Sequence, residues 1–297
     1  MKIITVTLNP CIDADYVMKT PFCAGKLNRT EEPAISYNGK GINVSRVLKR
    51  LGEDSCLMTL TPNKGGEEMV ESLLKEGLSV CAVRSEGRLR RNTSVLDSLG
   101  VQTQINEPGS PVGEDVLRQV TAQFKSELNC PDKKVAVLCG SLPPGADSDF
   151  YRKLCVIAQN SGAYVIADCD GENLKSVMKA QPDMIKPNEE EFLSLTGKKF
   201  SGRGEEKRIE AVRAALAFYR DGGTAVLCTL GEDGSVFAGP EGSYMCQARK
   251  TNIKKFKGAG DSFLAAYIYE HIVCDKDCDM AMMLAGARSA DYLAGIL

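Results

Sequence analysis

A carboxylate set inside a glycine-rich turn is the feature of this sequence with the clearest chemistry. The turn is Gly258-Ala259-Gly260-Asp261, and it opens the apolar run 262–268. Its small residues let backbone N–H groups converge where a helix begins, and the helix dipole adds positive potential there, so the turn can cradle an anion. An aspartate beside that anion suits a general base that deprotonates an alcohol attacking a phosphoryl group. The pattern is also compatible with an ordinary capped helix start.

A second glycine-rich turn, near the start of the chain, carries hydrogen-bond donors for a polar ligand. In Asn38-Gly39-Lys40-Gly41-Ile42-Asn43 the glycines allow a ligand to approach the backbone, while Lys40 and Asn43 supply donors. Apolar residues follow at helical spacing over 44–51, and Gly52 ends the pattern. The spacing matches neither the P-loop nor the dinucleotide-binding fingerprint. On its own, this turn is also compatible with a solvated lysine beside a helix start.

The composition is that of a globular protein without a charge bias. The chain has 297 residues, of which 43 % are hydrophobic and 26 % charged, and its formal net charge is −2. This balance disfavours nucleic acid and anionic membranes as partners. No apolar run approaches the roughly 18 residues that span a bilayer, and residues 1–6 have the pattern of a strand rather than of a signal peptide. We therefore expect a cytoplasmic protein.

The twelve cysteines are scattered, and several lie inside apolar runs where cysteine acts as a small hydrophobic residue. Only His271, Cys274 and Cys278 lie close together in sequence, and no fourth ligand accompanies them. We therefore predict that this group is not a metal site. Because His271 is the only histidine, the sequence disfavours a histidine-based triad and a multi-histidine metal centre.

Apolar runs alternate with helical patterns along most of the chain. Buried parallel strands are predicted over residues 3–8, 135–139, 164–167, 184–185 and 224–230. Helices are predicted over residues 66–76, 113–128, 147–161, 171–180, 205–220 and 280–293, and residues 198–206 are expected to form an exposed loop. This alternation indicates an α/β fold, a doubly wound and mainly parallel sheet with helices on both faces.

Motifs in a fixed order resemble those of the ribokinase superfamily, and within it the phosphofructokinase-B family of sugar kinases. The similarity is to the branch that contains 1-phosphofructokinase and tagatose-6-phosphate kinase, and it covers nearly the whole chain. The matching segments are 7–13, 25–26, 39–44, 90–92, 105–109, 140–145, 186–191, 230–231 and 258–261. The resemblance implies one ribokinase-like domain over residues 1–297, with a small β-lid built from about 13–38 and 89–106. Within that lid, strands are predicted at 93–96 and 101–105, joined by a turn at 97–100.

The resemblance also implies the roles of residues on the sugar side. Asp261 would be the general base, and the N–H groups of Gly258, Ala259 and Gly260 would stabilise the transferring phosphoryl group. Asp13, Gly39, Lys40 and Asn43 would hold sugar hydroxyls. Lys26, Arg90 and Asn92 mark the branch that binds phosphorylated sugars, since a phosphate needs a cationic pocket and arginine matches its geometry. Ser141 would add a further bond to the sugar phosphate. A strand-end turn at Asp13 and a solvated basic run over 84–91 are the simpler alternatives.

On the nucleotide side, the resemblance assigns Asn188 and Glu191 to the water shell of Mg²⁺ on ATP, although adjacent acids also suit a solvated helix start. Thr229, Gly231, Gly234 and Gly260 would line the ATP site. The expected reaction is ATP-dependent phosphorylation of a ketohexose phosphate, most closely fructose 1-phosphate. The alternatives are tagatose 6-phosphate as substrate, a family member that binds sugar phosphate without catalysis, and a nucleoside or ribose kinase, which Lys26 and Arg90 disfavour. A homodimer formed through the lid is a further expectation.

Four features depart from the family pattern. Asn38 stands where this branch usually has glycine, and the segment 60–66 differs from the usual glycine-rich one. Lys255 and Lys257 replace small or polar residues before the Gly258 turn, where they would add positive charge near ATP, replace a bound monovalent cation or point to solvent. The closing segment over the adenine is expected to be short, because the chain ends at Leu297.

Overall fold

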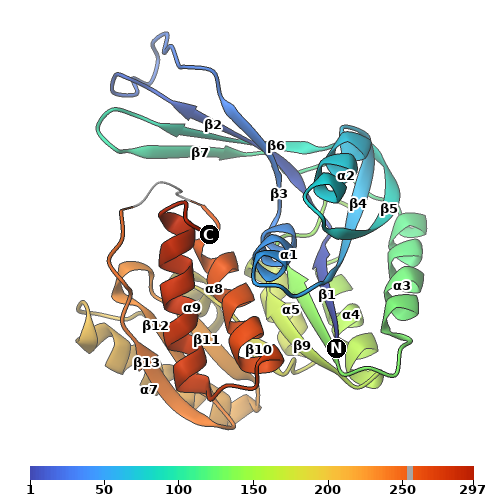
Figure 1. Cartoon of the computed structure of the whole chain (residues 1–297), viewed down its shortest axis with the longest axis vertical. Coiled ribbons are helices and arrows are strands. Elements are labelled where there is room, and N and C mark those ends of the chain that lie inside the picture. The colour runs from blue at the N-terminus through green and yellow to red at the C-terminus, as the bar shows by residue number, and fades with distance from the viewer. Residues whose placement is uncertain (253–256) are drawn as a thin grey trace.

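The computed structural model describes residues 1–252 and 257–297, which form two sheets (Figure 1). The large sheet has nine strands in the order β13-β12-β11-β10-β9-β8-β1-β4-β5, parallel from β11 to β5 and antiparallel at β12 and β13. Its strands are β1 (Lys2–Thr7), β4 (Cys56–Lys64), β5 (Ser79–Arg88), β8 (Lys134–Cys139), β9 (Ala163–Asp168), β10 (Met184–Ile185), β11 (Ala225–Thr229), β12 (Ser235–Gly239) and β13 (Gly242–Cys246). The predicted doubly wound, mainly parallel sheet is therefore confirmed.

Helices cover both faces of the large sheet because its strands are apolar on both sides. On β1, Ile4 belongs to one core cluster and its neighbour Ile3 to the other, as the two-residue period of a strand requires. One face packs against α3 (Glu114–Leu128), α4 (Phe150–Asn160), α5 (Gly171–Met178), α6 (Glu189–Thr196) and α7 (Glu205–Gly222). The other packs against α1 (Lys40–Arg50), α2 (Gly66–Lys75), α8 (Ala259–Tyr267), the π-helical turn Ile268–Val273 and α9 (Cys278–Leu293).

Most predicted elements begin and end within three residues of their observed limits. The helix predicted over 66–76 is α2, and that predicted over 205–220 is α7. The loop expected at 198–206 is only partly exposed, because Phe200 is buried against Phe192 with their ring centroids 5.8 Å apart and because α7 begins at Glu205. The sequence patterns did not predict β4, β5, β12 or β13.

The small sheet has four strands in the order β3-β2-β6-β7 and extends beyond one end of the large sheet, over α8 and α9 in Figure 1. Its strands are β2 (Cys11–Val17), β3 (Ala34–Asn38), β6 (Arg90–Leu96) and β7 (Gln102–Asn106). The predicted turn after residue 96 is present, since the Asp97 carboxylate accepts the N–H groups of Leu99 and Val101 at 2.9 and 3.0 Å. The small sheet continues the large one directly, because β2 follows β1 after three residues and only Leu89 separates β6 from β5.

Among the described residues, no helix is long and apolar enough to cross a membrane.

Candidate active site

The Gly258 turn forms the start of α8 and is braced from behind by α9. Gly258 has φ of +82°, in the left-handed region that disfavours a side chain, and a Cβ there would lie 2.7 Å from the Tyr292 hydroxyl oxygen. The Ser289 hydroxyl donates to the carbonyl of Ala259 at 3.0 Å. Glycine is thus required for a turn that exposes its N–H groups at the N-terminal end of α8.

Asp261 lies in the first turn of α8 and is 8 % exposed. Its Oδ2 accepts a hydrogen bond from Asn43 Nδ2 at 2.8 Å, which joins the two glycine-rich turns of the sequence. Burial, followed by the charge of Asp168, raises the pKa of Asp261 from its ordinary 3.8 to about 6. A carboxylate with this pKa is ionised at neutral pH and remains a stronger base than an exposed aspartate.

The start of α1 lies directly against β1, and this contact places Lys40 and Asn43. A Cβ on Gly41 would lie 2.5 Å from Thr7 Oγ1 and 3.1 Å from the carbonyl oxygen of Val6, so only glycine permits this approach. Gly39 is the N-terminal cap of the helix. The predicted convergence of the turns at Gly39 and Gly258 is therefore present in the structure.

Lys40 lies in a buried cluster of charges behind Asp261. Its Nζ donates to Asp168 Oδ1 at 2.9 Å and to Glu191 Oε1 at 3.4 Å, and Lys186 Nζ lies 3.4 Å from the same Asp168 oxygen. Burial opposes the charge on Lys40, but Asp168, Glu191 and Asp261 outweigh it and raise the Lys40 pKa well above its usual value. Burial likewise opposes ionisation of Asp168, yet Lys186 and Lys40 keep its pKa low. Lys40 and Asp168 are therefore both charged at neutral pH.

Asn188 and Glu191 form a reciprocal cap at the start of α6. Asn188 Oδ1 accepts the Glu191 N–H at 2.8 Å, and Glu191 Oε2 accepts the Asn188 N–H at 2.8 Å. The Glu191 carboxylate therefore already bonds a backbone N–H and approaches Lys40. A bound cation would share this carboxylate with those partners.

The residues predicted to line the ATP site lie beside this cap. Asn188 pairs with Thr229 in a parallel bridge, and the Thr229 N–H donates to the carbonyl of Pro187 at 3.0 Å. The following loop folds back through a bond from the Leu230 N–H to the Gly234 carbonyl at 2.8 Å, and the short 3₁₀ helix Gly231–Asp233 lies within it. Lys186 Nζ would lie 3.4 Å from a Cβ on Gly260, which connects this loop region to the α8 turn.

Asp13 lies in the small sheet, opposite Asn92 in register, and is 6 % exposed. Its carboxylate accepts hydrogen bonds from Asn92 Nδ2 at 3.1 Å and from Asn38 Nδ2 at 3.0 Å. Asn38, the departure from the family glycine, is thus a polar partner of Asp13 and also accepts a bond from Arg46. Asn92 Oδ1 is buried and has no hydrogen-bond partner among the described residues, so it is ready to accept a ligand hydroxyl.

Arg90 and Ser141 are connected through Asn9. Arg90 Nε donates to the Asn9 carbonyl at 3.0 Å, and Asn9 Nδ2 donates to Ser141 Oγ at 3.2 Å. A pocket beside them is lined by Asn9, Arg90 and other polar groups, including Ser85, Arg88 and Ser110. Arg90 therefore lines this pocket at the junction of the two sheets, and Asn9 connects it to Ser141, which lies outside the lining.

Lys26 is the predicted site residue that the structure does not bring to this group. It lies exposed in the long connection between β2 and β3, where its N–H donates to the Cys23 carbonyl at 3.3 Å. None of its contacts with the described residues reaches Arg90 or Asn92. This connection contains no strand that would fix the lysine over the site.

Lys257 reaches the small sheet. Its Nζ donates to Asp15 Oδ1 at 2.9 Å and lies 3.9 Å from Asp13 Oδ1. This contact differs from the roles considered from the sequence, which directed the lysine toward ATP or toward solvent. It ties the residue before the Gly258 turn to the strand that carries Asp13. Lys255 lies outside the described residues.

A family model for pfkB carbohydrate kinases matches residues 6–279. The chain belongs to the pfkB family. It is therefore an ATP-dependent carbohydrate kinase, as the sequence motifs predicted. The match includes both glycine-rich turns, the small sheet and the charged cluster.

Solved structures of phosphofructokinases have the same fold. Phosphofructokinase-2 from Escherichia coli in complex with fructose-6-phosphate is 25 % identical, with a TM-score of 0.87 over 98 % of this chain and 93 % of that chain. Its tetrameric inhibited form gives the same identity and TM-score over 98 % of this chain and 94 % of that one. A protein from Thermotoga maritima described as a possible 1-phosphofructokinase has 23 % identity and a TM-score of 0.82, over 100 % and 93 % of the two chains. The predicted ribokinase-like fold is confirmed.

Sequence reasoning missed three residues that the pfkB site places beside the predicted ones, namely Asp168, Lys186 and Asn9. Asp168 ends β9, and open α/β sheets place ligand contacts at the carboxyl ends of their strands, so that signal was available. Asp13 had been expected at the end of the first strand, but it is the third residue of β2 in the small sheet. Lys186 and Asn9 lie inside motifs that had been recognised, but a motif does not show which members turn inward. The burial and polar contacts of Lys186 and Asn9 in the structure show that these two side chains turn inward.

Proposed function

We propose that this pfkB kinase transfers the terminal phosphoryl group of ATP to a free primary hydroxyl of a ketohexose phosphate, with Asp261 as the general base. The observation that carries the proposal is the placement of Asp261. It is buried at an anion-binding helix start, between the charged cluster of Lys40 and Asp168 and the sheet that holds Asp13. Phosphoryl transfer requires alignment, charge neutralisation and a proton acceptor, and these residues supply all three.

In the proposed reaction the Asp261 carboxylate takes the proton of the attacking sugar hydroxyl. Its pKa of about 6 keeps it ionised at neutral pH while leaving it basic enough to accept that proton. Asn43 holds the second carboxylate oxygen in place. The N–H groups of Gly258, Ala259 and Gly260 stabilise the negative charge that grows on the transferring group, and Lys40 and Lys186 add positive charge beside them.

The sugar would lie between Asp13, Asn92 and Asp261. Asp13 accepts sugar hydroxyls, and Asn92 Oδ1, buried without a partner among the described residues, accepts another. The phosphate already on the sugar would lie against Arg90 in this pocket, with Asn9 connecting Arg90 to Ser141. Among the described residues, Arg90 uses Nε and Nη1 for its hydrogen bonds, so Nη2 remains to bind a phosphate oxygen. This cationic pocket favours a sugar phosphate over a free sugar.

The donor set around Asp168 fits Mg²⁺, which prefers oxygen ligands and retains several waters. Asp168 Oδ2 is buried and has no hydrogen-bond partner among the described residues, and the Asn188 and Glu191 side chains lie in the same region. These three residues would hold the ion, Asn188 and Glu191 through its waters. When bound, Mg²⁺ neutralises charge on the ATP phosphates.

Fructose 1-phosphate is the substrate we propose, converted to fructose 1,6-bisphosphate, with tagatose 6-phosphate as the alternative. Both carry a CH₂–phosphate and a CH₂–OH across a similar ring. The preference rests on resemblance of residues 39–51 and 105–109 to 1-phosphofructokinases. A coupled assay of ADP release should be run on fructose 1-phosphate, tagatose 6-phosphate, fructose 6-phosphate, fructose and ribose. The highest kcat/KM is expected for fructose 1-phosphate. A preference for free fructose or ribose would refute the sugar-phosphate assignment, and no ADP release with any sugar would indicate a binding protein.

We also propose that the small sheet acts as a lid over the sugar and pairs with the same sheet of a second chain. Large apolar side chains are exposed on the small sheet and its connections, whereas the surface of a monomer rarely exposes a large apolar patch. They include Val17, Phe22, Leu27, Ile35, Leu99, Val101 and Ile105. Ile35 and Ile105 lie in one cross-strand row with Ala14 and Thr93. An Ile105→Asp variant should be a monomer by light scattering, whereas Leu74→Asp, exposed on α2, should assemble like the parent.

All twelve cysteines are free in the structure. Together with the use of ATP, this agrees with the proposed cytoplasmic location, because free thiols persist in a reducing compartment.

A further inference from the structure

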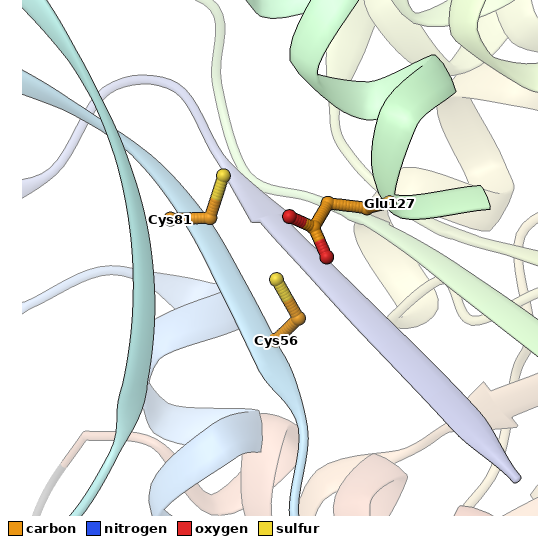
Figure 2. A group of neighbouring side chains, drawn as sticks. All are labelled: Cys56, Cys81 and Glu127. Carbon is orange, nitrogen blue, oxygen red and sulfur yellow. The ribbon is translucent and has the colours of Figure 1, made fainter. Parts of the chain in front are cut away.

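Two cysteines and a glutamate meet at the end of the large sheet opposite the active site. Cys56 begins β4, Cys81 is the third residue of β5, and Glu127 is the second-last residue of α3. Figure 2 shows their three side chains pointing toward one another. Their thiol sulfur and carboxylate oxygen atoms all lie within 4.8 Å of one another. The active site lies at the other ends of these parallel strands, so the group takes no part in it.

The fold itself brings the three residues together. Met58 is the register partner of Cys81, so Cys56 and Cys81 are two positions apart along adjacent parallel strands. Side chains two positions apart point to the same face of a sheet. That face is the one covered by α3, since Cys56 belongs to the same core cluster as Phe124, and Cys81 packs against it. The last turn of α3 then presents Glu127 to both thiols.

The ionisable groups of Cys56, Cys81 and Glu127 suit the binding of a cation. The hydrogen bond from Cys56 lowers the pKa of the Cys81 thiol, and the same interaction, with burial, raises the pKa of Cys56, so Cys81 loses its proton more readily than Cys56. The ion pair with Lys2, at 2.8 Å, keeps the pKa of Glu127 low. The group therefore offers a carboxylate and two thiols, of which Cys81 loses its proton more readily, with the ammonium of Lys2 as the only cation among its described partners.

We propose that Cys56, Cys81 and Glu127 bind a thiophilic divalent cation of the zinc class, with water as the fourth ligand. Two thiolates exclude the hard cations Mg²⁺ and Ca²⁺, which take oxygen ligands. Bond lengths of about 2.3 Å to sulfur and about 2.1 Å to oxygen place ligand atoms roughly 3.5–3.8 Å apart in a tetrahedral site. The present spacing, within 4.8 Å, needs only small side-chain rotations to reach this. Binding of the cation releases the protons that the two thiols carry and displaces Lys2 from Glu127.

The test is a titration of the reduced, metal-free protein with Cd²⁺, which reports thiolate ligation through an ultraviolet charge-transfer band, followed by competition with Zn²⁺. We expect one Cd²⁺ per chain and release of thiol protons near neutral pH. Cys81→Ser, at a half-buried position on an edge strand, should lose the charge-transfer band. It should also weaken Cd²⁺ binding by more than the roughly 10–100-fold that is typical when a residue that only hydrogen-bonds a metal ligand is replaced. Cys23→Ser, at an exposed cysteine, should bind like the parent.

Two further variants separate ligation from a general effect on folding. Glu127→Gln should weaken Cd²⁺ binding while leaving the thiolate band intact, and Lys2→Met should tighten it because Glu127 loses its competing partner. The proposal is overturned if Cys81→Ser binds Cd²⁺ as the parent does. It is equally overturned if the reduced parent shows no thiolate band while mild oxidation joins Cys56 to Cys81, which would make the pair a redox couple.

Discussion

Replacing Asp261 by Asn should make the protein inactive and more stable at the same time. The pKa of Asp261 is raised, so the folded protein binds this proton more tightly than the unfolded chain does. Between the unfolded and folded pKa values, stability therefore falls as pH rises, and above about pH 6 the ionised carboxylate carries its full cost. Asparagine removes that charge and can still accept the hydrogen bond from Asn43.

The size of the expected gain in stability follows from the pKa shift of Asp261. A change from 3.8 to about 6 corresponds to about 3 kcal/mol in the free energy of unfolding, at about 1.4 kcal/mol per pH unit. Lys40 loses one of its three carboxylate neighbours, which reduces the gain. We therefore expect Asp261→Asn to be more stable than the parent by ~1–3 kcal/mol near pH 8. The difference should shrink as the pH falls through the folded pKa of about 6 and vanish below about pH 3.8, where Asp261 is protonated in the unfolded chain as well.

Urea unfolding of the parent and the variant at several pH values measures this difference. Asp132→Asn, an exposed carboxylate outside the site, corrects for the loss of one negative charge. Turnover should fall by ~10²–10⁴-fold or more, with ATP and sugar binding retained, because only the proton acceptor is lost. Turnover within tenfold of the parent would place the base elsewhere. A stability gain that does not change with pH, or a loss near pH 8, would refute the argument from the buried charge.

Three further substitutions test other parts of the site. Arg90→Ala should cost ~2–4 kcal/mol in kcat/KM for the phosphorylated sugar, as expected for the loss of a charge-assisted bond, with little effect on an unphosphorylated analogue; equal losses for both sugars would show that Arg90 does not bind the phosphate. Glu191→Gln keeps a side chain that can complete the helix cap, so it should raise the Mg²⁺ requirement more than the sugar KM; a change in sugar KM alone would contradict the magnesium role. Lys257→Met should raise the sugar KM by a few fold, since a partly exposed pair contributes ~0.2–1 kcal/mol, and the exchange Lys257→Asp with Asp15→Lys should restore it. Lys19→Met, which removes an exposed ion pair with Glu31 in the connection between β2 and β3, is its control and should leave KM unchanged.

The sequence predicted the elements whose pattern is local. Helices such as α2 and α7 have apolar residues at helical spacing and a glycine near one end, so their limits were predicted closely. The strand β5 was not predicted, because it lies at the edge of the large sheet and most of its side chains are exposed or half-buried. The continuous apolar pattern of a central strand is absent there. Its place is determined by pairing with β4, which no local pattern reveals.

For the site, the motifs named residues but not their partners. Asn43 and Asp261 were both predicted, and the structure joins them across 218 positions of sequence. Lys257 was singled out as a departure, yet its partner Asp15 lies on another sheet and could not be inferred. The same limitation hid Cys56, Cys81 and Glu127, because only the register of β4 with β5 and the packing of α3 bring them together. The only cluster visible in the sequence, around His271, is not among the metal-ligand groups of the described residues.

The direct continuation of one sheet into the other has a consequence for how substrate preference can change. Three passages between the small sheet and the body lie beside the proposed sugar site: β1 leads to β2 through Asn9, β3 leads to α1 at Gly39, and Leu89 joins β5 to β6. The small sheet contributes Asp13, Asn38 and Asn92, whereas Asp261, Lys40 and Asp168 belong to the body with the large sheet. Under the proposed function, most residues that recognise the acceptor and those that carry out the transfer are thus encoded in separable stretches of chain, with Ser141 as an acceptor residue in the body.

A related kinase could therefore exchange its small sheet as a cassette, replacing the residues that recognise the acceptor while the base and the nucleotide site stay in place. The contact between Lys257 and Asp15 joins the body to the small sheet, so the charge at position 15 of an exchanged sheet must be complementary to that of Lys257. A graft that carries Asp15 with it should keep this match, and one that lacks an acid at that position should lose it.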